Sequence, residues 1–469
     1  MNTGNPSGAF VSGPLAMADA ALFTDLYELT MAAAFFRQGL GGRATFSLFA
    51  RRLPPGRGFL VAAGLEDALE YLRGFRFTDP GLGFLRSLGR FEPAFLDYLR
   101  GLRFTGEVRA VPEGTLVFAD EPLLEVTAPI LEAQLVETAL LNLLHGQTVL
   151  ASKAARSVLA ADGRMLAEFG LRRSHGTDAG MKAARAALVA GFDSTSNVLA
   201  GLTWGLPLSG TMAHSFVTAF ATEDEAFRAY ARAFPDAAVL LLDTYDTVAA
   251  ARKAVEVARE LAAAGHHLAG VRLDSGDLAA LSREVRAILD AGGFPAVKVL
   301  VSGGLDEHDI AALLAQAAPI DGFGIGTRLT TSADAPSVDL VYKLARFDGR
   351  DVLKLSQGKR TWVGAKQVMR RVGPDARLAG DTLALAEEPV PAGAIGLLEP
   401  VMRGGEPLRA HPALSEIRAH CAAELAALPD AVRRLSDPAA YAPAPSERLR
   451  ERQRAAEAGV SAGRVGAPE

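Results

Sequence analysis

The chain has 469 residues, 49 Lys and Arg against 54 Asp and Glu, and a formal net charge of −5, which gives no electrostatic footprint for nucleic acid. Hydrophobic residues make up 49% and charged residues 22%, which argues against disorder and supplies enough apolar material for two or three packed domains. One cysteine, Cys421, excludes an internal disulfide framework. The first basic residue is Arg37, and no run approaches 18 apolar residues. We therefore expect a cytoplasmic protein without a signal peptide or membrane span.

The N-terminal part predicts a short tail and then a mixed α/β domain. Residues 1–22 are rich in Gly, Ser and Ala and predict a disordered tail. Over 23–150 we expect an α/β domain, with a helix that ends at Arg37, strands over Ala44–Ala50 and Phe59–Ala63, and a helix over Leu65–Arg73. An amphipathic pattern over Leu131–Ala161 predicts one long helix, and we place a domain boundary inside it.

Residues 151–345 alternate short apolar strands with Ala-rich helices. The strand candidates are Met165–Glu168, Gly191–Ser194, Pro207–Thr211, Ala238–Asp243, Leu268–Asp274, Val297–Ser302 and Ile320–Gly324. The later strands end roughly 25 to 30 residues apart, which is the spacing of βα units in a parallel sheet or barrel. A TIM-like barrel is the favoured fold, although an open doubly wound sheet has the same local pattern.

The C-terminal part predicts a third region and a second tail. Residues 346–443 begin with β-like pieces at Val352–Leu355, Thr361–Val363 and Val368–Arg371 and continue as a Pro- and Ala-rich helical segment. Residues 444–469 hold Arg, Glu, Ala and Gly without an aromatic residue after Tyr441, which predicts a frayed helix or a disordered tail.

Polar residues gather where the predicted strands end, and in parallel α/β folds those ends face one mouth. Arg172 and Arg173 follow one strand, Gly303-Gly304 and Gly326-Thr327 follow two others, and Asp274 and Asp277 flank a Ser-Gly turn. Guanidinium groups, glycine turns and carboxylates together indicate a site for a phosphorylated anion with a metal ion. Each feature has a plainer interpretation: the glycines as tight turns, Thr244 and Asp246 as helix caps, and His175 as a hydrogen-bonded loop residue.

Six motifs in chain order resemble the nicotinate phosphoribosyltransferase family. They are Thr24-Asp25-Leu26-Tyr27-Glu28-Leu29-Thr30-Met31, Gly170-Leu171-Arg172-Arg173, Gly191-Phe192-Asp193-Ser194-Thr195-Ser196-Asn197, Gly210-Thr211-Met212-Ala213-His214-Ser215, Arg272-Leu273-Asp274-Ser275-Gly276-Asp277 and Gly324-Ile325-Gly326-Thr327. The resemblance extends from about residue 23 to about residue 371, and six separated motifs in order are far more specific than any one of them.

The resemblance implies a type II phosphoribosyltransferase fold: an irregular TIM-like, incomplete α/β barrel with an additional α/β domain formed by the N- and C-terminal regions. It implies a homodimer whose active sites draw on both subunits. The implied reaction makes nicotinate mononucleotide and pyrophosphate from nicotinate and phosphoribosyl pyrophosphate. It is coupled to ATP hydrolysis, as in an ATP-dependent ligase, and serves NAD biosynthesis. Mg²⁺ is the implied metal and ATP the co-substrate.

The resemblance also implies roles for single residues. His214 corresponds to the catalytic histidine that ATP phosphorylates, while Tyr27, Thr211 and Arg272, with Arg172, correspond to nicotinate contacts. The phosphoribosyl pyrophosphate site would include Thr327, Gly326, Gly303, Gly304 and Ser275. Asp274 is the candidate group for the charge that develops on the sugar, and Asp274 with Asp277 is the candidate Mg²⁺ pair.

Two departures from the family pattern and three alternatives accompany this interpretation. Val363 stands before Gly364 where the family usually has proline, and Ser174-His175 follows the two arginines where Ala-Gln is expected.

Two of the alternative functions are those of related enzymes. Nicotinamide phosphoribosyltransferase binds an uncharged amide, and quinolinate phosphoribosyltransferase must hold two carboxylates. A phosphate-binding TIM-barrel protein without transferase activity explains the strand–helix rhythm but leaves His214 and Tyr27 without a task.

Overall fold

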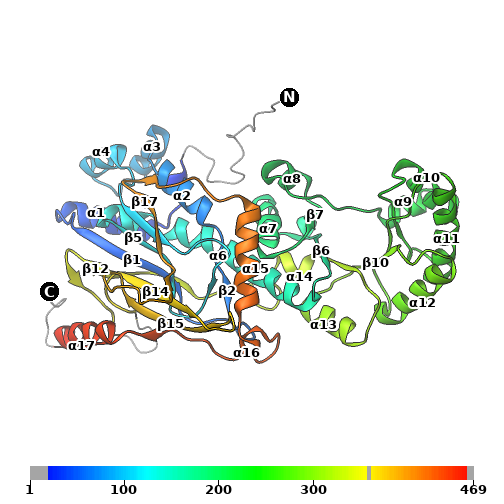
Figure 1. Cartoon of the computed structure of the whole chain (residues 1–469). Coiled ribbons are helices and arrows are strands. Elements are labelled where there is room, and N and C mark those ends of the chain that lie inside the picture. Colours follow the sequence, from blue (N-terminus) through cyan, green and yellow to red (C-terminus); the bar gives the residue numbers. More distant parts are fainter. Residues whose placement is uncertain (1–18, 356–360, 462–469) are drawn as a thin grey trace. The chain divides into compact units, whose positions relative to one another are not determined.

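The computed structural model describes residues 19–355 and 361–461, and the chain forms two compact units (Figure 1). One unit is the continuous segment 153–334. The other combines the chain up to Ser152 with the chain from Ala335 onward. The predicted domain borders lie after residues 150 and 345, and the two units meet in the chain after Ser152, which lies in α6 (Glu137–Ala161), and after Asp334.

The segment 153–334 is built on a parallel six-stranded sheet in the order β7-β6-β11-β10-β9-β8. Its strands are β6 (Met165–Glu168), β7 (Ser194–Thr195), β8 (Val239–Leu241), β9 (Gly270–Leu273), β10 (Lys298–Val301) and β11 (Gly322–Ile325). Across this fully described segment the edge strands β7 and β8 do not pair with each other. The fold is therefore an incomplete α/β barrel, as the sequence predicted.

Helices follow most of these strands and pack on the sheet through apolar faces (Figure 1). They are η3 (Leu171–Arg173), α7 (Thr177–Ala190), α8 (Val198–Trp204), α9 (His214–Thr218), α10 (Glu223–Ala233), α11 (Thr247–Ala263), α12 (Leu278–Ala291), α13 (Glu307–Ala315) and α14 (Thr327–Thr330). In α11 the buried residues Ala250, Ala254 and Leu261 recur at helical spacing. Asp246 caps α11 and Asp277 caps α12, because their carboxylates accept backbone N–H groups at 2.7 and 3.0 Å.

The other unit contains a seven-stranded sheet in the order β13-β12-β1-β5-β3-β17-β18. N- and C-terminal parts of the chain interleave in it, since β12 pairs with β1 and β17 with β3. The aromatic rings of Phe46 on β1 and Tyr342 on β12 stack at 4.6 Å. The prediction that the C-terminal region packs with the N-terminal domain is confirmed.

The helices and strands of the unit that contains this sheet have the following bounds. Its strands are β1 (Arg43–Ala50), β2 (Leu60–Val61), β3 (Glu107–Ala110), β4 (Leu116–Val117), β5 (Pro122–Pro129), β12 (Leu340–Phe347), β13 (Arg350–Asp351), β14 (Lys366–Val372), β15 (Leu378–Leu385), β16 (Ala394–Gly396), β17 (Glu399–Arg403), β18 (Glu406–Pro407) and β19 (Ala444–Pro445). Its helices are η2 (Ala20–Leu22), α1 (Leu26–Arg37), α2 (Leu65–Gly74), α3 (Asp79–Ser87), α4 (Pro93–Gly101), α5 (Ile130–Leu135), α15 (Leu414–Ala427), α16 (Asp430–Arg433) and α17 (Glu447–Ser461); α6 (Glu137–Ala161) crosses the border at 152.

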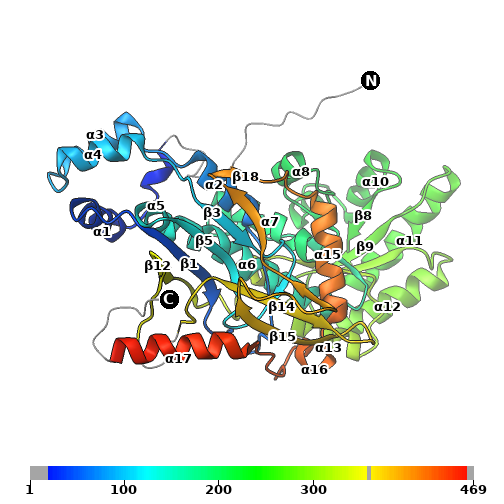
Figure 2. The same ribbon diagram turned by 60° about the vertical axis from the view of Figure 1, so that its left-hand side comes forward.

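Both predicted tails contain ordered structure. Helix α17 lies along β15 (Figure 2) and buries Leu449, Gln453 and Ala456, so 447–461 form a packed helix in place of the predicted frayed helix or disordered tail. The composition is typical of a disordered tail because Leu449 and Ala456 are the fully buried apolar residues among those described in this helix, and many of its other residues are charged. At the other end η2 buries Ala21. Residues 1–18 and 462–469 of the predicted tails lie outside the described residues.

Three further expectations differ from the structure. The long helix over Leu131–Ala161 is divided at Val136 into α5 and α6. Pro207–Thr211 forms one isolated bridge, from Leu208 to Thr195, because Pro207 and Gly210 disfavour a longer ladder there. Among the described residues of the C-terminal region, Val352–Leu355 and Thr361–Val363 are not strands, whereas β15 to β18 were not predicted.

Val363 occupies its unusual position without loss of the turn. Gly364 after it has φ +75°, and the Gly364 N–H donates to the Ala345 carbonyl at 3.1 Å. Val363 is fully buried, and its own N–H donates to Gln453 Oε1 at 3.1 Å. A proline has no N–H to donate, so α17 is anchored here by a bond that valine makes possible.

In the part of the chain that the structure describes, helices with the length and apolarity of a membrane span are absent.

Candidate active site

The loops that follow the parallel strands enclose a cavity of about 540 Å³ within 153–334. Most of its lining follows β6, β9, β10 and β11 directly or comes from the segment before α9, which is the carboxyl edge of the sheet. The lining residues are Phe169, Leu171, Arg172, Arg173, Ser196, Gly210, Thr211, Met212, Ala213, His214, Arg272, Asp274, Ser302, Gly303, Gly304, Gly324, Gly326 and Thr327. We call this cavity the mouth.

Arg272, in β9, is the guanidinium group held most firmly in the mouth. Its Nη2 donates to the Met212 carbonyl at 3.2 Å, which fixes the plane of the group. Its Nε is buried and has no hydrogen-bond partner among the described residues. Burial lowers the pKa of Arg272, against the opposite effect of Asp274 and Asp243, but a guanidinium stays charged at neutral pH. A buried, charged donor without a partner is a binding group for an anion.

Arg172 and Arg173, in η3, add two more guanidinium groups to the lining. Neither side chain has a hydrogen-bond or ion-pair partner among the described residues, and both are exposed. Three arginines thus face one cavity, and their mutual repulsion is relieved when an anion binds.

Hydrogen bonds connect the loops that follow β8, β9 and β10 at the mouth. Asp243 Oδ2 accepts the Asp274 N–H at 3.1 Å and the Ser275 hydroxyl at 2.5 Å, while its Oδ1 is buried and has no partner among the described residues. Ser302 donates its hydroxyl to Asp274. Gly303 has φ +102°, and a Cβ at this position would collide with the Asp274 carbonyl oxygen. The glycine therefore lets the β10 loop approach the β9 loop closely.

His214 begins α9 at the rim of the mouth and is exposed. Its Nδ1 lies 3.1 Å from the Thr244 hydroxyl, which follows β8. The tautomer with the proton on Nδ1 donates to Thr244 and leaves the lone pair of Nε2 available to a ligand. Thr244 is therefore a partner of His214, and Asp246 alone caps α11.

A ring and a buried carboxylate shape the opposite part of the mouth. Gly324 faces the Phe169 ring so closely that a Cβ there would lie 2.6 Å from the ring atoms, which holds the ring in place. Glu168 is buried and accepts the Thr195 hydroxyl at 2.6 Å and the Gly170 N–H, although burial raises its pKa. Ser174 contacts the Thr330 hydroxyl at 2.5 Å, so the unusual Ser174-His175 segment is joined to α14.

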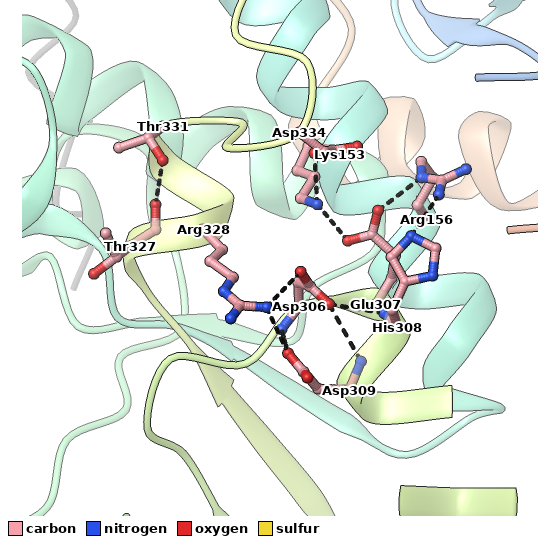
Figure 3. Close-up of polar contacts among 10 residues, drawn as sticks. All are labelled: Lys153, Arg156, Asp306, Glu307, His308, Asp309, Thr327, Arg328, Thr331 and Asp334. Carbon is pink, nitrogen blue, oxygen red and sulfur yellow. Dashed lines mark hydrogen bonds and ion pairs between the residues drawn. The ribbon is translucent and has the colours of Figure 1, made fainter. Parts of the chain in front are cut away.

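A group of ion pairs joins the two glycine loops from outside the mouth (Figure 3). Arg328 follows Thr327, and its Nη1 lies 2.7 Å from Asp306 and 2.9 Å from Asp309 at the start of α13. Although burial opposes it, the hydrogen bond from Arg328 lowers the pKa of Asp306 to about 2. The Gly326-Thr327 loop and the Gly303-Gly304 loop are thus held at a fixed separation.

A second set of ion pairs in Figure 3 is buried beside the first. Glu307 is fully buried and lies 2.5 Å from Lys153 Nζ and 2.8 Å from Arg156 Nε. Lys153 Nζ also lies 2.7 Å from Asp334. Burial opposes ionisation of Glu307, but Lys153 and Arg156 lower its pKa, so the carboxylate is charged and fixes the start of α13.

Most of the predicted site residues come together at the mouth. Its lining includes Arg172, Thr211, His214, Arg272, Asp274, Gly303, Gly304, Gly326 and Thr327. Ser275 and Asp277 follow Asp274 but are not in the lining, and Asp277 uses one carboxylate oxygen to cap α12. Tyr27 belongs to α1 in the other unit, so its predicted role stays a prediction. The sequence did not single out Phe169, Asp243, Thr244 and Ser302 as site residues, although each lies within three residues of the end of a strand.

One carboxylate of the mouth and one beside it fit a divalent cation. Asp243 Oδ1 is a buried, unpaired carboxylate oxygen, and Asp274 lies beside it on the next strand. Mg²⁺ usually takes one or two carboxylates and completes its shell with water and substrate phosphates. Asp243 and Asp274 fit that requirement better than Asp274 with the capping residue Asp277.

An incomplete parallel barrel with an anion-binding mouth, in a chain whose other unit is formed by N- and C-terminal segments, is a type II phosphoribosyltransferase fold. Family models match in three parts: the nicotinate phosphoribosyltransferase N-terminal domain over 22–145, the nicotinate phosphoribosyltransferase family over 165–371 and the C-terminal domain over 391–453. A nicotinate phosphoribosyltransferase of Mycobacterium tuberculosis is 49% identical over 92% of this chain and 92% of its own length. The human one is 36% identical over 91% of this chain and 95% of its own.

Solved structures agree with these sequence comparisons. The human nicotinic acid phosphoribosyltransferase structure matches with a TM-score of 0.82 at 35% identity, over 91% of this chain and 98% of that one. A structure described as nicotinate-nucleotide pyrophosphorylase from Pyrococcus furiosus matches with a TM-score of 0.72 at 25% identity, over 88% and 97%. The chain belongs to the nicotinate phosphoribosyltransferase family.

Proposed function

We propose that this chain transfers the phosphoribosyl group of phosphoribosyl pyrophosphate to the ring nitrogen of nicotinate, giving nicotinate mononucleotide and pyrophosphate for NAD biosynthesis. The observation that carries the proposal is Arg272, whose buried Nε donor has no partner among the described residues and which lines a cavity rich in arginine and glycine. A carboxylate is the group that a fixed guanidinium binds best, and nicotinate differs from nicotinamide in carrying one.

Phosphoribosyl transfer also requires the other groups of the mouth, each in a different role. Transfer at the anomeric carbon passes through an oxocarbenium-like state, so a carboxylate near the sugar, Asp274, stabilises the developing positive charge. The Phe169 ring offers a flat apolar surface for the pyridine ring, and Tyr27 is the proposed second one. Backbone N–H groups of the two glycine loops bind phosphate oxygens, while Arg172 and Arg173 attract the anionic substrate.

We further propose that ATP phosphorylates His214 and that the modified histidine favours the binding of phosphoribosyl pyrophosphate. The contact between Nδ1 and Thr244 supports this role, because the tautomer in which Nδ1 donates to Thr244 has an Nε2 lone pair that can attack the γ-phosphorus of ATP. The Nε2–P bond forms as the bond from phosphorus to the ADP oxygen breaks, and later transfer to water returns free imidazole and phosphate. This coupling would place the enzyme in the ATP-dependent ligase class.

The proposed cofactor is Mg²⁺, with Asp243 and Asp274 as the protein groups that would hold it. When bound, it would neutralise charge on the pyrophosphate leaving group. We also propose that the chain acts in the cytoplasm as a homodimer whose sites use residues of both subunits.

The test is incubation of the purified protein with phosphoribosyl pyrophosphate, Mg²⁺ and one pyridine substrate, with and without ATP, and chromatography of the products. We expect nicotinate mononucleotide from nicotinate, more of it with ATP, and little product from nicotinamide or quinolinate. A preference for nicotinamide or quinolinate would reassign the substrate. No product from any of the three would contradict the transferase function.

A further inference from the structure

A second cavity, of about 220 Å³, lies in the unit formed by the N- and C-terminal segments. Much of its lining is apolar, and Glu113, His411 and His420 are among the polar residues. The donor atoms of Glu66, Glu113 and His411 all lie within 4.8 Å of one another. Across residues 19–355 and 361–461, this is the one group of three His, Cys, Asp or Glu side chains that converges so closely.

The three side chains come from segments far apart in the sequence. Glu66 lies in the first turn of α2, Glu113 lies between β3 and β4, and His411 lies between β18 and α15. Glu113 is only 6% exposed, and its Oε1 accepts the Gly64 N–H at 2.5 Å. Gly64 directly precedes α2, so this bond fixes the Glu113 carboxylate next to the helix that carries Glu66.

His411 supplies an observation that is independent of the two carboxylates. Its Nε2 is buried and has no hydrogen-bond partner among the described residues. By contrast, His420 in the same cavity has the Thr115 hydroxyl 2.9 Å from its Nε2. A buried ring nitrogen without a partner loses its hydration and gains nothing in return, whereas a cation at its lone pair restores the interaction.

We propose that Glu66, Glu113 and His411 bind a divalent transition-metal ion of the Zn²⁺ type. An imidazole nitrogen with carboxylate oxygens suits Zn²⁺ and its neighbours, whereas Mg²⁺ and Ca²⁺ take oxygen ligands. The site lies in the other unit from the mouth and is separate from the proposed Mg²⁺ site. Glu113 and His411 both border the cavity, which has room for the water that completes a tetrahedral shell.

The ion would have a stabilising role, because its ligands join the loop before α15 to the start of α2 and to the loop after β3. Metal binding to a folded site raises stability by mass action. It would also hold the segment around Arg409, an exposed arginine of the kind after which trypsin cleaves, so zinc should slow cleavage there.

The experiment uses the full-length protein, freed of metal with a chelator and titrated with Zn²⁺, and with Co²⁺ as the spectroscopic probe, in buffer containing Mg²⁺. We expect one ion per chain and slower tryptic cleavage after Arg409 when Zn²⁺ is present. His411→Ala and Glu113→Gln should each weaken binding at least tenfold. Glu113→Gln keeps an acceptor for the Gly64 N–H, so it tests the charge without removing that bond.

His267→Ala is the matched control, because His267 is an exposed histidine whose Nδ1 lies 3.2 Å from Asp236. It should bind zinc as the unaltered protein does. Three results would each overturn the proposal. The first is an equal loss of zinc binding in His267→Ala, and the second is unchanged zinc binding in both His411→Ala and Glu113→Gln. The third is that Mg²⁺ displaces all of the bound zinc. Melting temperatures without metal show whether a variant is folded. If one of the two ligand variants is unfolded, the other and Glu66→Gln decide.

Discussion

Replacing Arg272 by lysine tests whether the mouth recognises a carboxylate. Arg272 uses Nη2 to bind the Met212 carbonyl at 3.2 Å, and its buried Nε remains for a ligand. Lysine keeps the positive charge but loses the planar fork, so one ammonium group must replace both the anchoring donor and the binding donor. Losing one charge-assisted hydrogen bond costs about 1.5 to 3 kcal/mol, which corresponds to about a 10- to 100-fold loss of nicotinate affinity.

The assay is initial-rate kinetics of Arg272→Lys with each substrate varied in turn. The KM for nicotinate should rise by about that factor, with a much smaller change for phosphoribosyl pyrophosphate. Arg259→Met is a suitable control, because it removes an exposed arginine that pairs with Glu256 on α11 and leaves the mouth untouched. Equal weakening of both substrates by Arg272→Lys would refute the reasoning and assign Arg272 to the phosphates or to the fold.

Three further outcomes are expected. His214→Ala should fold and make some nicotinate mononucleotide at high phosphoribosyl pyrophosphate, but lose ATPase activity, ATP stimulation and acid-labile phosphate together; a variant that still hydrolyses ATP would move the phosphoryl acceptor elsewhere, with His175 tested next. Arg328→Met breaks the link between the two glycine loops and should raise the KM for phosphoribosyl pyrophosphate by about fivefold, the equivalent of about 1 kcal/mol. The KM for nicotinate and the melting temperature should not change. A shift in both KM values together with a lower melting temperature would indicate a structural role alone. Light scattering should report about twice 49.2 kDa, and a fully active monomer would contradict a shared site.

The strand–helix rhythm made the barrel predictable, because the short strands β8, β9 and β10 are each followed by a helix with an aspartate cap. The sheet of the other unit was harder to predict, since its stability depends on partners far along the chain. Asp381 in β15 is typical of a turn when the sequence is read locally, yet it is buried and pairs with Arg370 on β14 at 2.7 Å. Tertiary pairing of this kind overrides local propensity.

At the site, residue types and strand ends predicted Arg272, Asp274 and both glycine loops. Asp243 was missed because its role depends on β8 lying beside β9, and a sequence does not state strand order. Thr244 had a plainer interpretation as a helix cap, and its contact with His214 was not predicted because it crosses between two loops that are 30 residues apart in the chain. Local patterns locate groups at the mouth, and only the topology shows which groups meet.

The ion pair between Lys153 and Asp334 has a consequence for folding. These residues are the first and last of the barrel segment, and their charged atoms are 2.7 Å apart. A flexible insertion of that length would impose a loop-closure cost of about 4 to 5 kcal/mol on the discontinuous unit that surrounds it. In a barrel that has already folded, the Lys153–Asp334 ion pair holds the two ends of the insertion together, so most of this loop-closure cost is no longer imposed on the surrounding unit. We therefore expect the barrel to fold first and the flanking segments to assemble afterwards with little entropic penalty.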